Sequence, residues 1–270
     1  MPPMVSFLDM LAFAPALLLG ALMGFFGGLF GIGGGIIAIP LLVLGYGMDQ
    51  AMAQGTALVM MVPNLLIGWW RYSQRHPVPL AQALAVGGLA TATTWLVAHV
   101  AIGLPPGLLR AVFSVFLMLL AFRLLKQLYA SRQAGGAVPA EALAQASPRL
   151  PARYIPLVGM VGGSSMGLLG IGGGLVATPI FTGVFAQRQT VAQSLSLALV
   201  APSSVIALSS YAQAHRVDWH MGVPLALSGM LTVSAGVGLA HRLPEQRMKT
   251  LFAWMLLLTG GWLLVSMLWR

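Results

Sequence analysis

The chain has 270 residues, of which 58% are hydrophobic and only 7% are charged, whereas a soluble domain carries about 25% charged residues. This composition, with a mean hydropathy of +0.88, argues against a soluble enzyme and a disordered chain and predicts an all-α integral membrane protein. The net charge of +9 indicates basic loops at a membrane surface, not nucleic-acid binding. There is no cysteine, which excludes disulfides, thiolate metal sites and cysteine nucleophiles.

Five apolar segments are predicted in the first part of the chain. They cover residues 10–30, 34–46, 51–72, 80–102 and 106–128. The second of them follows a GIGGG run and contains Pro40. As a helix it would be about 20 Å long, which is too short for a hydrocarbon core about 30 Å thick.

A polar stretch rich in Ala, Gln, Pro and Gly follows at residues 129–152 and is predicted to be an interdomain linker. Five more apolar segments come after it, at 153–171, 173–186, 190–212, 219–240 and 246–268. The chain is therefore divided into a first transmembrane repeat at 10–128, the linker, and a second transmembrane repeat at 153–268.

The second set of segments repeats the first at a distance of 139 residues. At this shift GLFGIGGG (28–35) coincides with GLLGIGGG (167–174), and 10 of the 17 positions in 24–40 are identical. Gln54 likewise coincides with Gln193. We therefore expect the two halves to share one backbone plan.

The basic residues predict how the halves lie across the membrane. If each short segment returns to its starting side, the halves are inverted, and with a cytoplasmic linker 11 of the 14 Lys and Arg residues are cytoplasmic. If each pair of segments crosses only once, the halves are parallel and 9 are cytoplasmic. Cytoplasmic loops are enriched in Lys and Arg, so we predict two inverted-topology repeats, each a broken-helix hairpin plus three transmembrane helices. Both termini are then external.

Short segments interrupted by Gly and Pro at matching places in two halves indicate the binding site of a transporter. Glycines leave backbone N–H groups accessible, and the N-terminus of the following helix adds positive partial charge. Together these features make an anion site that needs no buried cation. The alternative is close helix packing through small residues, which explains Gly24 and Gly28 better than the three adjacent glycines of each GIGGG run.

The segments after the broken helices carry further polar side chains at membrane depth. Each of them either lines the site or makes an interhelical hydrogen bond, and the sequence leaves both interpretations open. The predicted substrate-binding residues are Gly33, Gly34, Gly35, Gln54, Thr56, Asn64, Gly172, Gly173, Gly174, Gln193, Ser194, Ser196 and Ser203.

All five acids lie at segment ends or in the linker, which argues against a carboxylate proton relay and against an acidic cation filter. Residues 163–167 match the G-x-S-x-G pattern of serine hydrolases. However, that pattern needs a strand-to-helix turn and triad partners, which this chain does not offer. We predict no catalytic residue, no metal site and no cofactor.

The doubled signature, GLFGIGGGIIAIP and GLLGIGGGLVATP, each followed by an Ala-Gln and a Pro in the next segment, resembles the TauE/SafE sulfite exporter family, also called toluene sulfonate uptake permeases. The similarity covers about residues 20–268. It implies a multi-pass permease of the bacterial inner membrane whose members are linked to sulfite, sulfoacetate and other sulfur-containing anions. Ser194 and Ser203 replace Gly55 and Asn64 of the first half, so the site is expected to be asymmetric.

The leading hypothesis is a permease that exports sulfur-containing anions by alternating access. It is not an enzyme, and its expected partners are a small anionic substrate and membrane lipid, without nucleic acid. One alternative is a channel or facilitator for another small anion, and a second is a membrane protein that transports nothing. The sequence leaves the anion, the coupling ion and the oligomeric state open.

Overall fold

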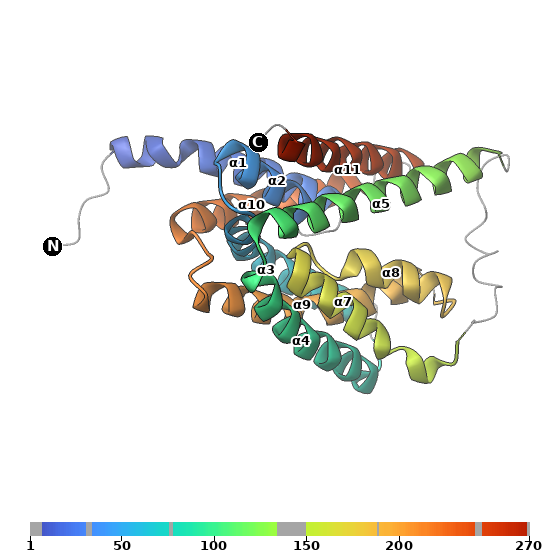
Figure 1. Cartoon of the computed structure of the whole chain (residues 1–270). Coiled ribbons are helices and arrows are strands. Elements are labelled where there is room, and N and C mark those ends of the chain that lie inside the picture. The colour runs from blue at the N-terminus through green and yellow to red at the C-terminus, as the bar shows by residue number, and fades with distance from the viewer. Residues whose placement is uncertain are drawn as a thin grey trace.

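A computed structural model of the chain describes residues 7–30, 34–75, 78–133, 150–187, 189–240 and 245–268, and every regular element in these ranges is a helix (Figure 1). The first half contains α1 (Phe7–Phe30), α2 (Gly35–Gly45), α3 (Gln50–Arg75), α4 (Leu80–Gly103) and α5 (Pro106–Gln133). The second half contains a 3₁₀ turn (Ala152–Tyr154), α7 (Leu157–Leu169), α8 (Gly174–Gly183), α9 (Gln189–Gln213), α10 (Trp219–Ala240) and α11 (Glu245–Leu268).

The predicted all-α fold is confirmed. Among the described residues, α3, α4, α5, α9 and α11 are long and apolar enough to cross a membrane. In contrast, α2 and α8 have 11 and 10 residues, which is too short to span it, as their Gly and Pro content predicts.

Helix starts recur at a fixed distance along the chain. α8, α9, α10 and α11 each begin 139 residues after α2, α3, α4 and α5. The starts follow local chemistry: Asp49 and Asp218 accept hydrogen bonds from the N–H groups of Met52 and Met221 in the first turns of α3 and α10, as N-cap carboxylates do.

Two boundaries differ from the sequence-based expectation. The apolar segment expected at 153–171 is the shorter helix α7, because Pro156 precedes it and Gly170, with φ of 65°, ends it in the left-handed conformation. At the other boundary, α5 continues to Gln133 and so includes the first residues of the expected linker. Residues 134–149 of that linker lie outside the described ranges.

The two halves exchange helices. α1 packs along α10 of the second half, and α4 packs along α7 in the same way. Small residues allow the close approach: a Cβ on Gly24 would lie 2.3 Å from the carbonyl oxygen of Gly229, and a Cβ on Gly163 would lie 2.2 Å from that of Ala90. Positions 24 and 163 correspond at the 139-residue shift, so both halves use the same packing device.

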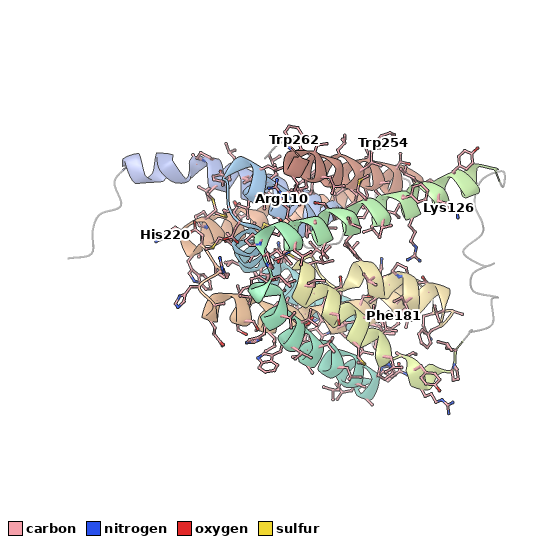
Figure 2. The ribbon with its side chains drawn as sticks, viewed as in Figure 1. Arg110, Lys126, Phe181, His220, Trp254 and Trp262 are labelled. Atoms are coloured by element: carbon pink, nitrogen blue, oxygen red, sulfur yellow. The ribbon has the colours of Figure 1, made fainter. Side chains whose placement is uncertain are left out.

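The centre of the molecule is formed by α3 and α9, which are the most buried of the membrane-length helices. One apolar cluster joins α3 to α4, α7, α8 and α9, and a second joins α3 to α2, α5, α10 and α11. Figure 1 shows the corresponding groups on either side of α3 and α9. On the outside, α11 turns Trp254 and Trp262 away from the protein (Figure 2), as expected for a surface that faces lipid.

We predict that Gly24→Ala destabilises the protein, because the added methyl group overlaps the backbone of Gly229. Such overpacking costs about 1–3 kcal/mol, which should appear as a lower melting temperature in detergent. The matched control is Gly88→Ala on α4, where a Cβ meets nothing within 4 Å and the melting temperature should not fall. Equal melting temperatures for the two variants would contradict this packing role.

Candidate anion-binding site

The glycine runs produce two helix beginnings without side-chain caps. Gly34 is the N-cap of α2 and has φ of 88°, a conformation that favours glycine. Gly173 is the N-cap of α8, and Gly172 before it has φ of 87°. Neither cap residue provides a side-chain hydrogen bond. The N–H groups of Ile37 and Val176 bond the carbonyl oxygens of Gly34 and Gly173, so the N–H groups without a side-chain cap are those of the first two residues of each short helix.

The two helix beginnings lie close together. A Cβ on Gly35 would lie 3.4 Å from the carbonyl oxygen of Gly170, which belongs to the glycine run of the other half. Met61 lies between the runs: its sulfur would be 2.3 Å from that Cβ, and its methyl group would be 3.9 Å from a Cβ on Gly172. Val200 contacts the second run from α9 at the position equivalent to Met61. The N-termini of α2 and α8 therefore converge near the middle of α3 and α9.

The electrostatics of this centre favour an anion. Each helix N-terminus carries roughly half a positive elementary charge, and two of them meet here. The acids in the described residues all stand in the first turn or at the cap of a longer helix: Asp9, Asp49, Asp218 and Glu245. Within the described residues no group of His, Asp and Glu side chains is arranged to hold a metal ion.

Gln54 is buried beside the second glycine run, but its amide group already has protein partners. The Gln54 Nε2 donates to the carbonyl oxygen of Leu168 at 3.4 Å, and the Tyr211 hydroxyl donates to Gln54 Oε1 at 2.7 Å. The same hydroxyl lies 3.2 Å from the carbonyl oxygen of Gly167. Gln54 and Tyr211 thus hold the end of α7 in place just before Gly170.

Thr56 also contacts the other half. Its hydroxyl oxygen accepts a hydrogen bond from the backbone N–H of Asp218 at 3.0 Å, in the connection between α9 and α10. Next to it, a Cβ on Gly55 would lie 2.0 Å from the carbonyl oxygen of Arg216. This part of α3 is therefore closed against the second half.

Asn64 differs from the other predicted residues of α3. Its side chain is only 8% exposed, and neither Nδ2 nor Oδ1 has a hydrogen-bond partner in the structure. An unsatisfied buried amide costs about 1–3 kcal/mol, and native proteins rarely leave such groups unpaired without a reason. Gln50 at the start of α3 also has an unpaired amide, but Asn64 is the residue of the predicted site that is left for contact with a bound molecule.

In the second half, the polar residues are largely engaged. The Ser196 hydroxyl lies 2.8 Å from that of Thr178, which joins α9 to α8. Ser203, the equivalent of Asn64, donates to the carbonyl oxygen of Leu199 in its own helix at 2.7 Å. Gln193 and Ser194 also have interaction partners.

The glycines of the second run differ from one another. A Cβ on Gly173 would lie 2.2 Å from the carbonyl oxygen of Gly162 in α7, whereas a Cβ on Gly174 would meet only Val200 and Ser196, at 3.5 and 3.7 Å. Gly173 is therefore a packing position, while Gly174 has space beside it. Gly33 lies outside the described residues.

The predicted list omits three residues that shape this centre. Met61 separates the glycine runs, Thr178 binds Ser196, and Tyr211 binds Gln54. Only Tyr211 has a signal in the sequence, because it coincides with Tyr72 at the 139-residue shift.

The family profile described as sulfite exporter TauE/SafE matches residues 16–263, which is most of the chain. The chain belongs to the TauE/SafE family. It is therefore a multi-pass membrane transporter, with its paired glycine runs at the centre of the fold.

Curated relatives point to the same class. A probable membrane transporter protein of Methanocaldococcus jannaschii is 23% identical over 223 residues, 78% of each chain. A probable membrane transporter protein of Xylella fastidiosa is 24% identical over 226 residues, 83% of each chain. No solved structure matches the chain.

We predict that Gly174→Ala weakens anion binding while the protein stays stable. The methyl group has room beside Val200 and Ser196, but it obstructs the N–H groups at the start of α8. Losing one hydrogen bond to a charged ligand costs about 1.5–3 kcal/mol, or roughly tenfold to a hundredfold in Kd. Calorimetric titration with sulfite, together with thermal melting, measures both effects.

The matched variant is Gly173→Ala, which should lower the melting temperature because its methyl group overlaps the α7 backbone. If the Kd of Gly174→Ala for sulfite equals that of the unmodified protein, the start of α8 does not bind the anion.

Proposed function

We propose that this protein is a permease that exports small sulfur-containing anions, such as sulfite, sulfoacetate or related organosulfonates, across the bacterial inner membrane. The observation that carries the proposal is the meeting of two helix N-termini without side-chain caps at Met61, about one turn of α3 before the unpaired amide of Asn64. Such a centre binds an oxyanion through backbone dipoles and neutral donors.

The proposed direction of transport and the proposed membrane rest on the family name, the chemistry of sulfite and the charge distribution. The name of the family describes sulfite export, and a toxic, reactive anion such as sulfite is chemically suited to removal from the cell. The bacterial inner membrane is consistent with the predicted cytoplasmic positive charge.

We propose further that the two halves are inverted relative to each other across the bilayer. Contacts between equivalent helices support this: Gln54, near the start of α3, bonds Tyr211, near the end of α9, whereas Gly68 near the end of α3 approaches Leu197 near the start of α9. Equivalent helices therefore run antiparallel. Arg110 at the start of α5 donates to Ser266 at the end of α11 and gives the same relation.

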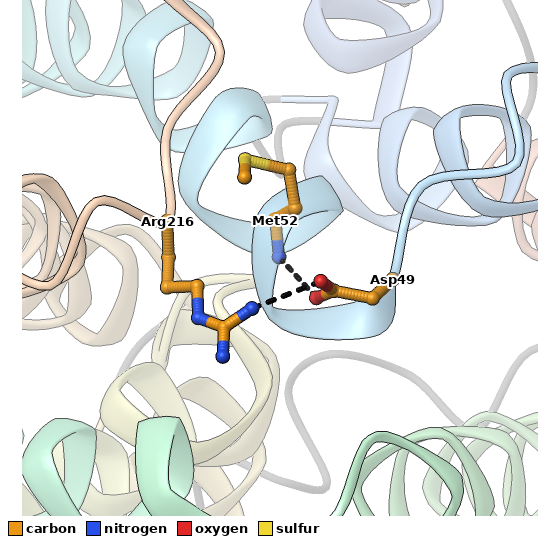
Figure 3. A network of polar contacts seen from close by, with 3 residues as sticks. All are labelled: Asp49, Met52 and Arg216. Carbon is orange, nitrogen blue, oxygen red and sulfur yellow. Dashed lines mark hydrogen bonds and ion pairs between the residues drawn. The ribbon is translucent and has the colours of Figure 1, made fainter.

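An ion pair between the halves also favours inversion over the parallel arrangement. The Arg216 guanidinium donates to Asp49 Oδ2 at 3.0 Å, while Asp49 Oδ1 accepts from the N–H of Met52 (Figure 3). In parallel halves the loops that carry Asp49 and Arg216 would lie on opposite sides of the membrane. In inverted halves both loops are external, so their contact supports the inverted topology.

The two halves differ in exposure, as alternating access requires. Gly35 and Ile36 at the start of α2 are buried, whereas Gly174 and Leu175 at the equivalent start of α8 are partly exposed. We propose that this is a state closed at the Asp49–Arg216 end, and that transport exchanges the environments of α2 and α8.

The ion pair at this end suits a gate. Its side chains are 38% and 33% exposed, and a solvent-exposed pair contributes on the order of 0–1 kcal/mol. Breaking it in each transport cycle therefore costs little.

A flux assay tests the proposed function. Proteoliposomes loaded with radiolabelled sulfite should release it with saturable kinetics, and unlabelled sulfoacetate should compete, whereas protein-free liposomes give the background rate. Efflux that rises linearly with concentration would indicate a channel instead of a carrier. Absence of flux for sulfite, thiosulfate, sulfoacetate, taurine and sulfate alike would refute the proposal.

The cysteine-free chain also allows a direct test of topology. Tyr46→Cys and Ala214→Cys should both react with a membrane-impermeant maleimide added to intact cells, because both loops are expected to be external. Arg153→Cys, after the linker, is the matched control and should react only after the cells are permeabilised. Labelling of Ala214→Cys from the cytoplasmic side alone would exclude inverted halves.

A further inference from the structure

The amide of Asn64 has both a hydrogen-bond donor and an acceptor available. Nδ2 and Oδ1 are both buried and unpaired, and the residue is only 8% exposed to solvent. A carboxamide can donate from nitrogen and accept at oxygen, and it cannot exchange these roles. The molecule that satisfies Asn64 must therefore offer both an acceptor and a donor.

The helical geometry of α3 directs Asn64 toward the start of α2. Successive residues of a helix are rotated by about 100°, so Asn64 lies angularly between Met60 and Met61, one turn further along. The Met60 methyl group would lie 2.9 Å from a Cβ on Gly34, and the Met61 sulfur 2.3 Å from a Cβ on Gly35. The same face of α3 that carries Asn64 is thus turned to the first residues of α2.

The direction of α2 brings its free N–H groups to the level of Asn64. Gly35 lies beside Met61, and the chain then returns along α3 to Gly45, close to the start of α3 at Gln50. α2 and α3 are therefore antiparallel, and the N–H groups of the first turn of α2 point away from its body, toward the turn of α3 that holds Asn64.

Resting on the proposed anion transport, we infer that the physiological ligand is a sulfur oxyanion that carries its own hydroxyl or ammonium donor, such as hydrogen sulfite or a hydroxy- or aminoalkanesulfonate. Asn64 Nδ2 and the α2 N–H groups donate to the oxygens on sulfur, and Asn64 Oδ1 accepts from the ligand's donor. An oxyanion without a donor, such as sulfoacetate at neutral pH, leaves Oδ1 facing lone pairs, so the site binds it more weakly than a ligand that carries a donor.

Only the first half provides this selection. At the equivalent position of α9, the Ser203 hydroxyl is satisfied by the carbonyl oxygens of Leu199 and Val200 in its own helix. A serine reaches its own helix backbone, whereas Asn64 makes no such bond. Asn64 therefore determines specificity from one side of the site, and Ser203 provides a matched control position.

The surroundings of Asn64 allow a test at one fixed pH. The described parts of α2 and α8, and of α3 before Arg71, contain no ionisable side chain. In α9, Tyr211 is bound to Gln54 and Gly167. The ionisable residues of α10 and α11 stand in their first turns, at His220 and at 245–249. Near His220, α10 meets α3 at Gly222, beside Val59, which precedes Asn64 by more than one helical turn of α3.

The test compares two ligands that differ only in a terminal hydroxyl group: 2-hydroxyethanesulfonate (isethionate) and ethanesulfonate. Calorimetric titration of the purified full-length protein should give a Kd about tenfold to a hundredfold lower for isethionate, the range expected when a buried acceptor is left unpaired. Asn64→Leu and Asn64→Ala should both remove this preference, while Ser203→Ala should keep it.

Thermal melting separates this role from a structural one. Because Asn64 makes no hydrogen bond within the protein, Asn64→Leu should not lower the melting temperature of the ligand-free protein. A structural amide would instead lower it on removal.

The outcomes distinguish this inference from the proposed function. Equal affinity for the two sulfonates in the unmodified protein, or a preference that persists in Asn64→Ala, would overturn the inference alone. If neither sulfonate nor sulfite binds, the proposed function itself fails. Should both Asn64 variants misfold, the ratio of affinities in the unmodified protein still decides the question.

Discussion

The structure depends on one constraint: a backbone polar group inside a membrane must be hydrogen-bonded or enclosed by protein. Two helices meet this constraint by enclosure, because α2 and α8 begin in the middle of the fold without side-chain caps. Their first N–H groups are tolerated only because α3 and α9 enclose them and the other helices keep lipid away. The arrangement of the remaining helices is best understood as the means of that enclosure.

The N-termini of α2 and α8 are enclosed without charged side chains, so the centre can attract an anion only through helix dipoles and neutral hydrogen-bond donors. A buried Lys or Arg would need a partner, whereas helix dipoles are fixed by the backbone and carry no counter-charge to satisfy. The polar side chains divide into two groups accordingly. Gln54, Thr56 and Tyr211 connect the halves to each other, and Asn64 remains for a bound molecule.

The local features of the fold follow from the sequence, because glycine and proline act through the backbone alone. The GIGGG runs and Pro40 predict short segments at 34–46 and 173–186, and the structure has short helices at Gly35–Gly45 and Gly174–Gly183. The small residues around Gly24 predict close packing, which its contact with Gly229 confirms.

The roles of individual polar residues could not be predicted, because they depend on partners far away in sequence. Gln54 is held by Tyr211, 157 residues further on, and no local pattern connects the two. Asn64 and Ser203 occupy equivalent positions and looked equally suited to ligand contact. They differ because a short hydroxyl group bonds its own helix, a distinction that becomes visible only with the packing around it. Likewise, Gly173 and Gly174 are adjacent and identical, yet only Gly173 touches α7.

The exchange of helices between the halves has a consequence for biosynthesis. The small-residue face of α1 packs against α10, so Gly24 can make its native contact only after Gly229 has been synthesised. At 5–20 residues per second this delay is roughly 10–40 s. During that time α1 sits in the membrane without its native neighbour, and the first half cannot complete its own fold. A ribosome that stops in the linker therefore leaves a first half in which the small-residue face of α1 has no native partner.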